Sequence, residues 1–521
     1  MDPEVSNDHP ILLPKLIYHF MKNNLLVSFA LAVSLFVNAQ QKNTLLDQSF
    51  WKTAPNVETV KAEIAKGNSP SASTANAFDV VVMAINNDAP TETIKFLLEQ
   101  PGNEVNKPTH DNRIYLHWAS GKGNVEIVKY LIAKGSDVNL EDSHGSFPVT
   151  AAASSGQSNP EIYNAFFKAG IDPKKKYQNG ANLLLLSISS DKELKAAEYF
   201  ITKGMSLKDV DSEGNTAFTY AARSGNIPLL KKLLEKGVKP NDNSLFTAAQ
   251  GSRRESNTIE TYKYLVEEVK IKPTALNNSG QNVLHLLAGK PNQTEIIKYF
   301  ISKGADPNKA DKEGTTPLMA AASARETSAL ELFLSTTKNV NLQNLKGESA
   351  LTNAIKYGSP EVVSLLLAKA DVNVKDKDGN NLGVYLVQSY RPQIMGRGQE
   401  GANAKQDPFA AKVKLLQDKG LNLATPQKDG NTLYHVAIIK NDLSLLKKIA
   451  DLNIDINAKN KDGLTALHKA AMISKDDAIL KYLLSIGAKK EIITEFDESA
   501  YALAKENESL TKSNISVEFL K

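Results

Sequence analysis

Histidines are the side chains in this sequence best suited to bind a metal ion or to transfer protons. Of the eight, four directly follow an apolar residue in similar short stretches such as "LYH" and "ALH". These four recur in step with a repeat of about 33 residues, which spaces them too far apart to share one metal ion. We therefore predict a structural role for His117, His285, His435 and His468. Two more, His110 and His144, fall in predicted turns, where we expect them to be solvated.

Carboxylates are the second group that could do chemistry. Asp211, Asp311 and Asp376 recur at one position of the repeat, which indicates that they form turns. Paired catalytic carboxylates need a shared pocket, and an open stack of repeats rarely offers one. The sequence contains no phosphate-binding loop, zinc-protease helix or serine-hydrolase elbow, and the glycines of 396–401 follow no strand. We expect no enzyme activity, no cofactor and no metal.

Composition narrows the class of partner. The chain has no cysteine, so disulfides, thiolate metal sites and thiol catalysis are excluded. Its net charge is only +4, and charges of both signs are interspersed. A nucleic-acid-binding protein would show a concentrated basic surface. We expect a protein partner and no nucleic acid.

The most apolar stretch, "LLVSFALAVSLFV" (25–37), bears on where the protein works. It is shorter than the about 20 residues that a membrane-spanning helix needs. Met21 and Lys22 precede it, and Val37 and Ala39 supply small residues at the −3 and −1 positions of a cleavage site, as in a secretory signal peptide. We therefore predict that 1–20 is an over-extended start, that 21–39 is cleaved after Ala39, and that the protein is periplasmic or secreted. A buried helix is the alternative interpretation.

One sequence pattern recurs along the remaining chain, 40–521. The helices and turns that it predicts are the elements that hold the histidines and carboxylates described above. "DKEGTTPLMAAAS" (311–323) and "NKDGLTALHKAAM" (460–472) both have a glycine, a Thr two residues later and then an apolar anchor. A second phrase, such as "IVKYLIAKG" (127–135), has apolar residues at helical spacing and ends in Lys-Gly, which suits a helix C-terminus. Each unit is therefore a helix, a turn, a second helix and an extended tip, and neighbouring units must stack to bury their apolar faces. The anchors are Leu116, Val149, Leu184, Phe218, Leu245, Leu284, Leu318, Leu351, Gly383, Tyr434, Leu467 and Tyr501.

This pattern resembles the ankyrin-repeat family, most closely at "GTTPLMAAA" (314–322) and "GLTALHKAA" (463–471). The resemblance implies an all-α solenoid of about fourteen helix–turn–helix units, with first helices and hairpin tips lining a concave face. It also implies a non-catalytic scaffold that binds a protein partner there, and it implies that the repeated histidines bond to backbone groups of the tips.

The family's contact positions flank the tip glycine and end the first helix. Transferred to this sequence, they predict a partner-binding surface between 311 and 473. Its apolar members would form the centre of the interface, although burial against a neighbouring tip is the alternative for each. The predicted residues are Leu345, Lys346, Glu348, Tyr357, Lys428, Asp429, Asn431, Lys461, Asp462, Leu464 and Met472.

Three segments depart from the repeat. The tip near 237–245 is short, which predicts a notch, and the Gly- and polar-rich insert 391–407 interrupts one repeat. A ligand-binding or enzymatic site at either place is the alternative function. The charged segment 489–521 is expected to be a capping repeat that presents a polar face to water.

Overall fold

The computed structural model describes residues 43–251, 256–391 and 407–521. The predicted signal peptide, residues 1–20 and nearly all of the insert 391–407 lie outside these ranges. The described residues form 28 α-helices and no strand beyond isolated bridges, so the all-α prediction is confirmed. None of these described helices is long and apolar enough to cross a membrane. Paired in chain order, they make the predicted fourteen repeats.

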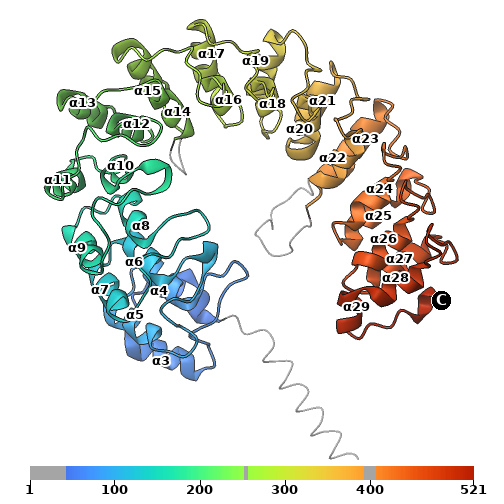
Figure 1. The fold of residues 1–521 in the computed structure, drawn as a ribbon, viewed down its shortest axis with the longest axis horizontal. Coiled ribbons are helices and arrows are strands. Elements are labelled where there is room, and N and C mark those ends of the chain that lie inside the picture. Colours follow the sequence, from blue (N-terminus) through green and yellow to red (C-terminus); the bar gives the residue numbers. More distant parts are fainter. Residues whose placement is uncertain (1–42, 252–255, 392–406) are drawn as a thin grey trace, which may run out of the picture. The chain divides into compact units, whose positions relative to one another are not determined.

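The chain divides into two compact units, 1–217 and 218–521. In unit 1, consecutive even-numbered helices from α4 to α10 pack against one another, and the odd-numbered helices from α3 to α9 form a second layer (Figure 1). Its helices are α2 (Gln48–Trp51), α3 (Val57–Ala65), α4 (Val80–Asn86), α5 (Thr91–Leu98), α6 (Tyr115–Lys122), α7 (Val125–Ala133), α8 (Pro148–Ser154), α9 (Pro160–Lys168), α10 (Leu183–Ser187) and α11 (Lys195–Thr202).

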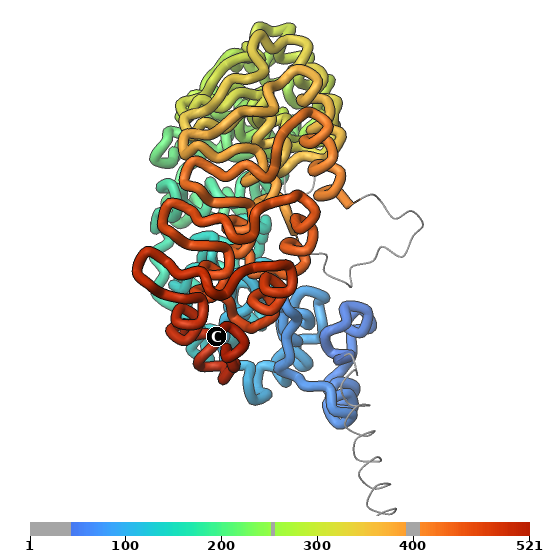
Figure 2. The backbone as a smooth tube through the Cα atoms, turned by 90° about the vertical axis from the view of Figure 1, so that its right-hand side faces the viewer, coloured from blue at the N-terminus to red at the C-terminus, as the bar shows by residue number. Residues whose placement is uncertain are grey.

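Unit 2 continues the same two-layer plan, with first helices from α14 to α28 packed in sequence. Figure 2 shows its backbone from yellow to red running back and forth in successive parallel layers. A π-helical turn, Tyr264–Glu268, extends α15. Its helices are α12 (Ala217–Ala222, which begins at the boundary), α13 (Ile227–Glu235), α14 (Asn243–Gln250), α15 (Ile259–Lys263), α16 (Val283–Leu287), α17 (Thr294–Ser302), α18 (Pro317–Ala321), α19 (Ser328–Thr336), α20 (Ala350–Tyr357), α21 (Pro360–Leu367), α22 (Leu382–Ser389), α23 (Pro408–Asp418), α24 (Leu433–Ile438), α25 (Leu443–Ile449), α26 (Ala466–Ile473), α27 (Ala478–Ser485), α28 (Ala500–Glu506) and α29 (Glu508–Lys512).

The helix boundaries follow the signals in the sequence. Thr316 accepts a hydrogen bond from the Met319 N–H, and Pro317 occupies the first position of α18, where its missing N–H costs nothing. At the other end of a repeat, Gly304 closes α17 with φ of +92°, a conformation that disfavours any residue with a side chain. The helix end predicted from the Lys-Gly pattern is confirmed.

The predicted anchors form the core. All of them are buried except Tyr501, which is only half-buried; the residue beside it, Ala500, is buried in its place. At Gly383 an added Cβ would lie 3.1 Å from Leu433 Cδ2. The neighbouring repeat therefore leaves little room for a side chain at this anchor. The stack of apolar first helices is therefore continuous from α4 to α10 in unit 1 and from α14 to α28 in unit 2.

Backbone hydrogen bonds join neighbouring tips. In unit 2 the N–H of Lys312 donates to the Ser279 carbonyl (2.9 Å), and the N–H of Leu345 donates to the Glu313 carbonyl (2.8 Å). Within one tip, Asp311 Oδ1 accepts from the N–H groups of Glu313 and Thr315 at 3.0 and 2.8 Å. The predicted turn-forming role of this aspartate is confirmed, and the tips are held both internally and to each other.

Two of the departures from the repeat are visible in the described residues. After Gly237 the chain enters α14 at Asn243 with almost no tip, as predicted. The insert follows α22 and precedes α23, so it does interrupt one helix pair.

Candidate protein-binding surface

The four repeated histidines are structural, as predicted. His435 Nδ1 accepts the N–H of Thr432 at 3.1 Å, and its Nε2 lies 2.9 Å from the Leu464 carbonyl in the next tip. His117 makes the corresponding bonds to the Ile114 N–H (3.3 Å) and the Ser146 carbonyl (3.0 Å). Each ring therefore fixes the start of its own helix and holds the adjacent tip.

This geometry selects one protonation state. In His117 and His435, Nδ1 faces an N–H donor and Nε2 faces a carbonyl, so the neutral ring with hydrogen on Nε2 satisfies both of these backbone partners. Burial is the main cause that lowers the pKa of His117, and the same holds for His285, His435 and His468. These side chains are therefore unsuited to general acid–base chemistry or metal binding.

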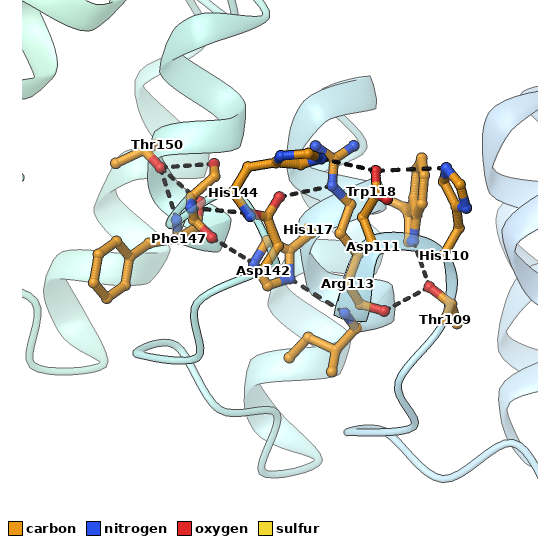
Figure 3. Close-up of polar contacts among 12 residues, drawn as sticks. Thr109, His110, Asp111, Arg113, His117, Trp118, Asp142, His144, Phe147 and Thr150 are labelled. Carbon is orange, nitrogen blue, oxygen red and sulfur yellow. Dashed lines mark hydrogen bonds and ion pairs between the residues drawn. The ribbon is translucent and has the colours of Figure 1, made fainter. Parts of the chain in front are cut away.

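In unit 1, a polar cluster joins two consecutive tips (Figure 3). Asp111 Oδ2 lies 3.5 Å from His110 Nε2 and 3.2 Å from His144 Nε2, with the two rings on opposite sides of the carboxylate. The His110 ring also bonds the Asn76 carbonyl through Nδ1 (2.9 Å) and stacks on Phe78. His144 is largely exposed, but the expectation that His110 is merely solvated was wrong.

A half-buried arginine pairs with a buried aspartate next to this carboxylate. Arg113 Nε donates to Asp142 Oδ2 at 2.9 Å, and its guanidinium lies 5.0 Å from the Trp118 ring centroid. Burial raises the pKa of Asp142, but hydrogen bonds from the Ser146 N–H and from Arg113 outweigh it and lower the pKa overall. The cluster fixes the two tips, and no group of three or more His, Asp or Glu side chains in the ranges that the structure describes is arranged to hold a metal ion.

The predicted contact residues of unit 2 lie on tips and at the ends of first helices. Leu345 is 55% exposed and Tyr357 51%, and Met472 is also exposed. Leu464 is half-buried, and its N–H donates to Asn460 Oδ1 at 3.0 Å. The predicted polar residues are exposed or half-buried: Lys346, Glu348, Lys428, Asp429, Asn431, Lys461 and Asp462.

Sequence reasoning missed Ile439, whose side chain is 63% exposed. It follows α24 at the repeat position that Met472 occupies in α26, so the signal was present in the alignment of repeats. Ile473 is exposed as well. Apolar side chains are therefore more frequent at this face than the sequence analysis assumed.

A cavity of about 510 Å³ opens elsewhere in unit 2. Its walls are the segments 256–259 and 291–296, which precede or begin the second helices α15 and α17. It includes no residue of the short tip near 237–245, where the alternative function would place a site. The insert that could hold the other alternative site lies outside the described residues.

Comparison with known proteins places the repeats in a family. A model described as "Ankyrin repeats (3 copies)" matches residues 55–142, 80–177, 150–244 and 284–376, and one described as "Ankyrin repeats (many copies)" matches 434–484. Human "Transient receptor potential cation channel subfamily A member 1" is 25% identical over 76% of this chain. Mouse "NF-kappa-B inhibitor delta" is 26% identical over 41% of this chain and 70% of its own length.

This chain spans 35% of the length of the human channel subunit and 20% of that of "Alpha-latroinsectotoxin-Lt1a" from Latrodectus tredecimguttatus. Ankyrin repeats indicate a protein-binding scaffold, which agrees with structural histidines and exposed apolar side chains on the tip face. The chain belongs to the ankyrin-repeat family.

Proposed function

We propose that this protein is a non-catalytic scaffold that is exported and binds a partner protein through the face formed by residues 311–473. The observation that carries the proposal is the set of exposed apolar side chains at Leu345, Tyr357, Ile439 and Met472. Isolated exposed apolar residues are normal, but a group of them on one face, rimmed by charges, is typical of an interaction surface. The rim is supplied by tip residues such as Lys346 and Asp429.

The test begins with the full chain as bait in the envelope fraction, followed by titration of the purified partner. Tyr357→Ala and Met472→Ala are each expected to weaken binding at least about tenfold, because truncating an interface anchor costs about 2 kcal/mol or more. Leu464→Ala should weaken it too, although its half-buried side chain also packs within the tip. Lys346→Ala should mainly change the salt dependence, as expected of a rim charge.

Circular dichroism and an unchanged melting curve must first show that each variant folds. A folded Tyr357→Ala/Met472→Ala protein that binds its partner as tightly as wild type would place the interface on another surface.

Export is supported by Lys22, the apolar run 25–37 and the small residue Ala39. The expected mature chain begins at Gln40, and N-terminal sequencing of protein from the periplasmic or culture fraction measures this directly. Replacing Leu31 and Val33 with Glu should block export by breaking the apolar run, while Asp2→Ala should leave export unchanged. Recovery of the full-length wild-type chain in the cytoplasm would contradict the proposal.

A further inference from the structure

Three cationic side chains gather where the first helices α20, α22 and α24 end. Arg391 Nη1 and Lys440 Nζ donate to the same acceptor, the Gln388 carbonyl, at 3.1 and 3.2 Å. Lys356 is close enough for its charge, together with that of Arg391, to lower the pKa of Lys440 further than desolvation alone does. We call Lys356, Arg391 and Lys440 the basic cluster.

The basic cluster has no acidic partner among the described residues. None of its three members forms an ion pair there. Lys469, one repeat further along, differs from the cluster. Desolvation lowers its pKa, but the nearby carboxylates of Asp429 and Asp462 act in the opposite direction. Like charges held together without a counter-charge are unfavourable, so a bound anionic group would relieve the repulsion.

A fourth cation lies beneath this surface. Lys412 is 5% exposed and donates to the Ile355 carbonyl near the end of α20 at 2.8 Å. Burial lowers the pKa of Lys412 to about 8. Carbonyls near the C-termini of α20 and α22 therefore already accept hydrogen bonds from lysine and arginine side chains. These cations reduce the negative potential at the two helix ends.

Exposed apolar side chains stand directly beside the cluster. Tyr357 follows Lys356 in α20, and the Lys356 ammonium lies 5.2 Å from the Tyr357 ring centroid. Ile439 precedes Lys440 and is 63% exposed. A ligand that fits this surface needs anionic groups and apolar groups close together.

We propose that the basic cluster, with Tyr357 and Ile439, binds an acidic segment of a partner protein that also carries aliphatic or aromatic side chains. The inference rests on the proposed function and adds the chemistry of the partner. A nucleic acid fits less well, because the adjoining tips carry exposed carboxylates at Asp378, Asp429 and Asp462, which would repel an extended polyanion.

The test selects random 12-residue peptides displayed on phage against the full chain. Enriched peptides are expected to carry Asp or Glu next to Leu, Ile or Phe. A synthetic copy of the best peptide, followed by fluorescence anisotropy, should bind Lys356→Gln/Lys440→Gln at least tenfold more weakly than wild type. The same peptide with Gln in place of each acid should lose a similar factor, and Ile439→Ser should weaken binding several-fold.

The matched control removes two charges from the other layer. Lys414 and Lys481 lie on second helices α23 and α27 with side chains 71% and 59% exposed, and Lys414→Gln/Lys481→Gln should change binding less than twofold. The inference is overturned if no peptide is enriched, if enriched peptides lack acidic residues, if the cluster variant binds them normally, or if a single-stranded oligonucleotide competes at equal concentration. If the natural partner is lost with Met472→Ala but retained by Lys356→Gln/Lys440→Gln, the proposed function stands and this inference fails.

Discussion

Deletion of residues 489–521 is expected to make the protein aggregate. This segment closes the stack on α26: the Ile492 carbonyl lies 2.9 Å from His468 Nε2, and Asn507 Nδ2 donates to the carbonyls of Ala471 and Ser474 at 3.0 and 2.8 Å. Helix α28 packs against α26, and Leu510 and Leu520 are buried in the segment. Its removal leaves apolar surface and helix-end carbonyls without partners.

The expected loss is large because repeats are stabilised mainly by their neighbours. Each buried Leu side chain contributes roughly 1.5–3 kcal/mol, and several lie at this junction. Size-exclusion chromatography with light scattering should show oligomers or aggregate where the full chain gives a single species. Thermal melting should show an earlier onset of unfolding.

The control for this deletion is Phe496→Ser in the full chain. Phe496 is 82% exposed on the last tip, so its replacement should leave the melting curve unchanged and, if anything, improve solubility. Phe496 also shows that this segment is less uniformly polar on its surface than a capping repeat was expected to be. A truncated protein that stays monomeric and melts with the full chain would show that the segment is dispensable.

The features predicted correctly from the sequence are those governed by local rules. The left-handed conformation of Gly304 and the bond from the Thr432 N–H to His435 each depend on residues within one turn or one repeat. The cap at Thr316 follows the same local rules. A single repeat contains the information for such contacts, and repetition makes the pattern visible.

Contacts between side chains of different repeats could not be predicted in the same way. Arg113 and Asp142 pair across two tips, and the sequence gives no rule for which charged tip residue faces which. The contact of Lys412 could have been predicted from the sequence. Lys412 lies eight residues before the glycine that ends its second helix, and at the same position other second helices have a buried isoleucine, Ile127 or Ile296. A lysine at a buried position indicates a polar partner on the neighbouring repeat, here the Ile355 carbonyl.

The second large effect expected is loss of stability in mild acid. In His285, His435 and His468 of unit 2, burial lowers the pKa of the imidazole, while in the unfolded chain it titrates near its ordinary value of about 6.5. The unfolded state therefore binds more protons as the pH falls below about 6.5. The stability that these rings contribute is fully present above that pH and is lost as the pH falls toward the folded-state pKa values.

The slope follows from the number of protons taken up on unfolding. One proton changes the free energy of unfolding by about 1.4 kcal/mol per pH unit, so the three histidines of unit 2 give a limiting slope of about 4 kcal/mol per pH unit. In the part of unit 1 that the structure describes, one such ring, His117, gives a limiting slope of about 1.4 kcal/mol per pH unit. Unit 2 should accordingly lose stability faster between pH 6.5 and 5.5.

Urea unfolding followed by circular dichroism at several pH values between 7.5 and 5.5 measures this slope. The structural reason for it is specific: protonation puts a hydrogen on Nδ1, which in His468 already faces the N–H of Thr465 at 3.1 Å, so two donors oppose each other.

His468→Gln should therefore lower stability at pH 7.5 but reduce the slope by about one proton, or about 1.4 kcal/mol per pH unit. His144→Gln, on an exposed tip of unit 1, should leave the slope of unit 2 unchanged. If the unfolding midpoints do not change with pH across this range, the neutral, doubly bonded state assigned to these rings is wrong, because a ring that accepts a proton equally well in both states contributes no slope.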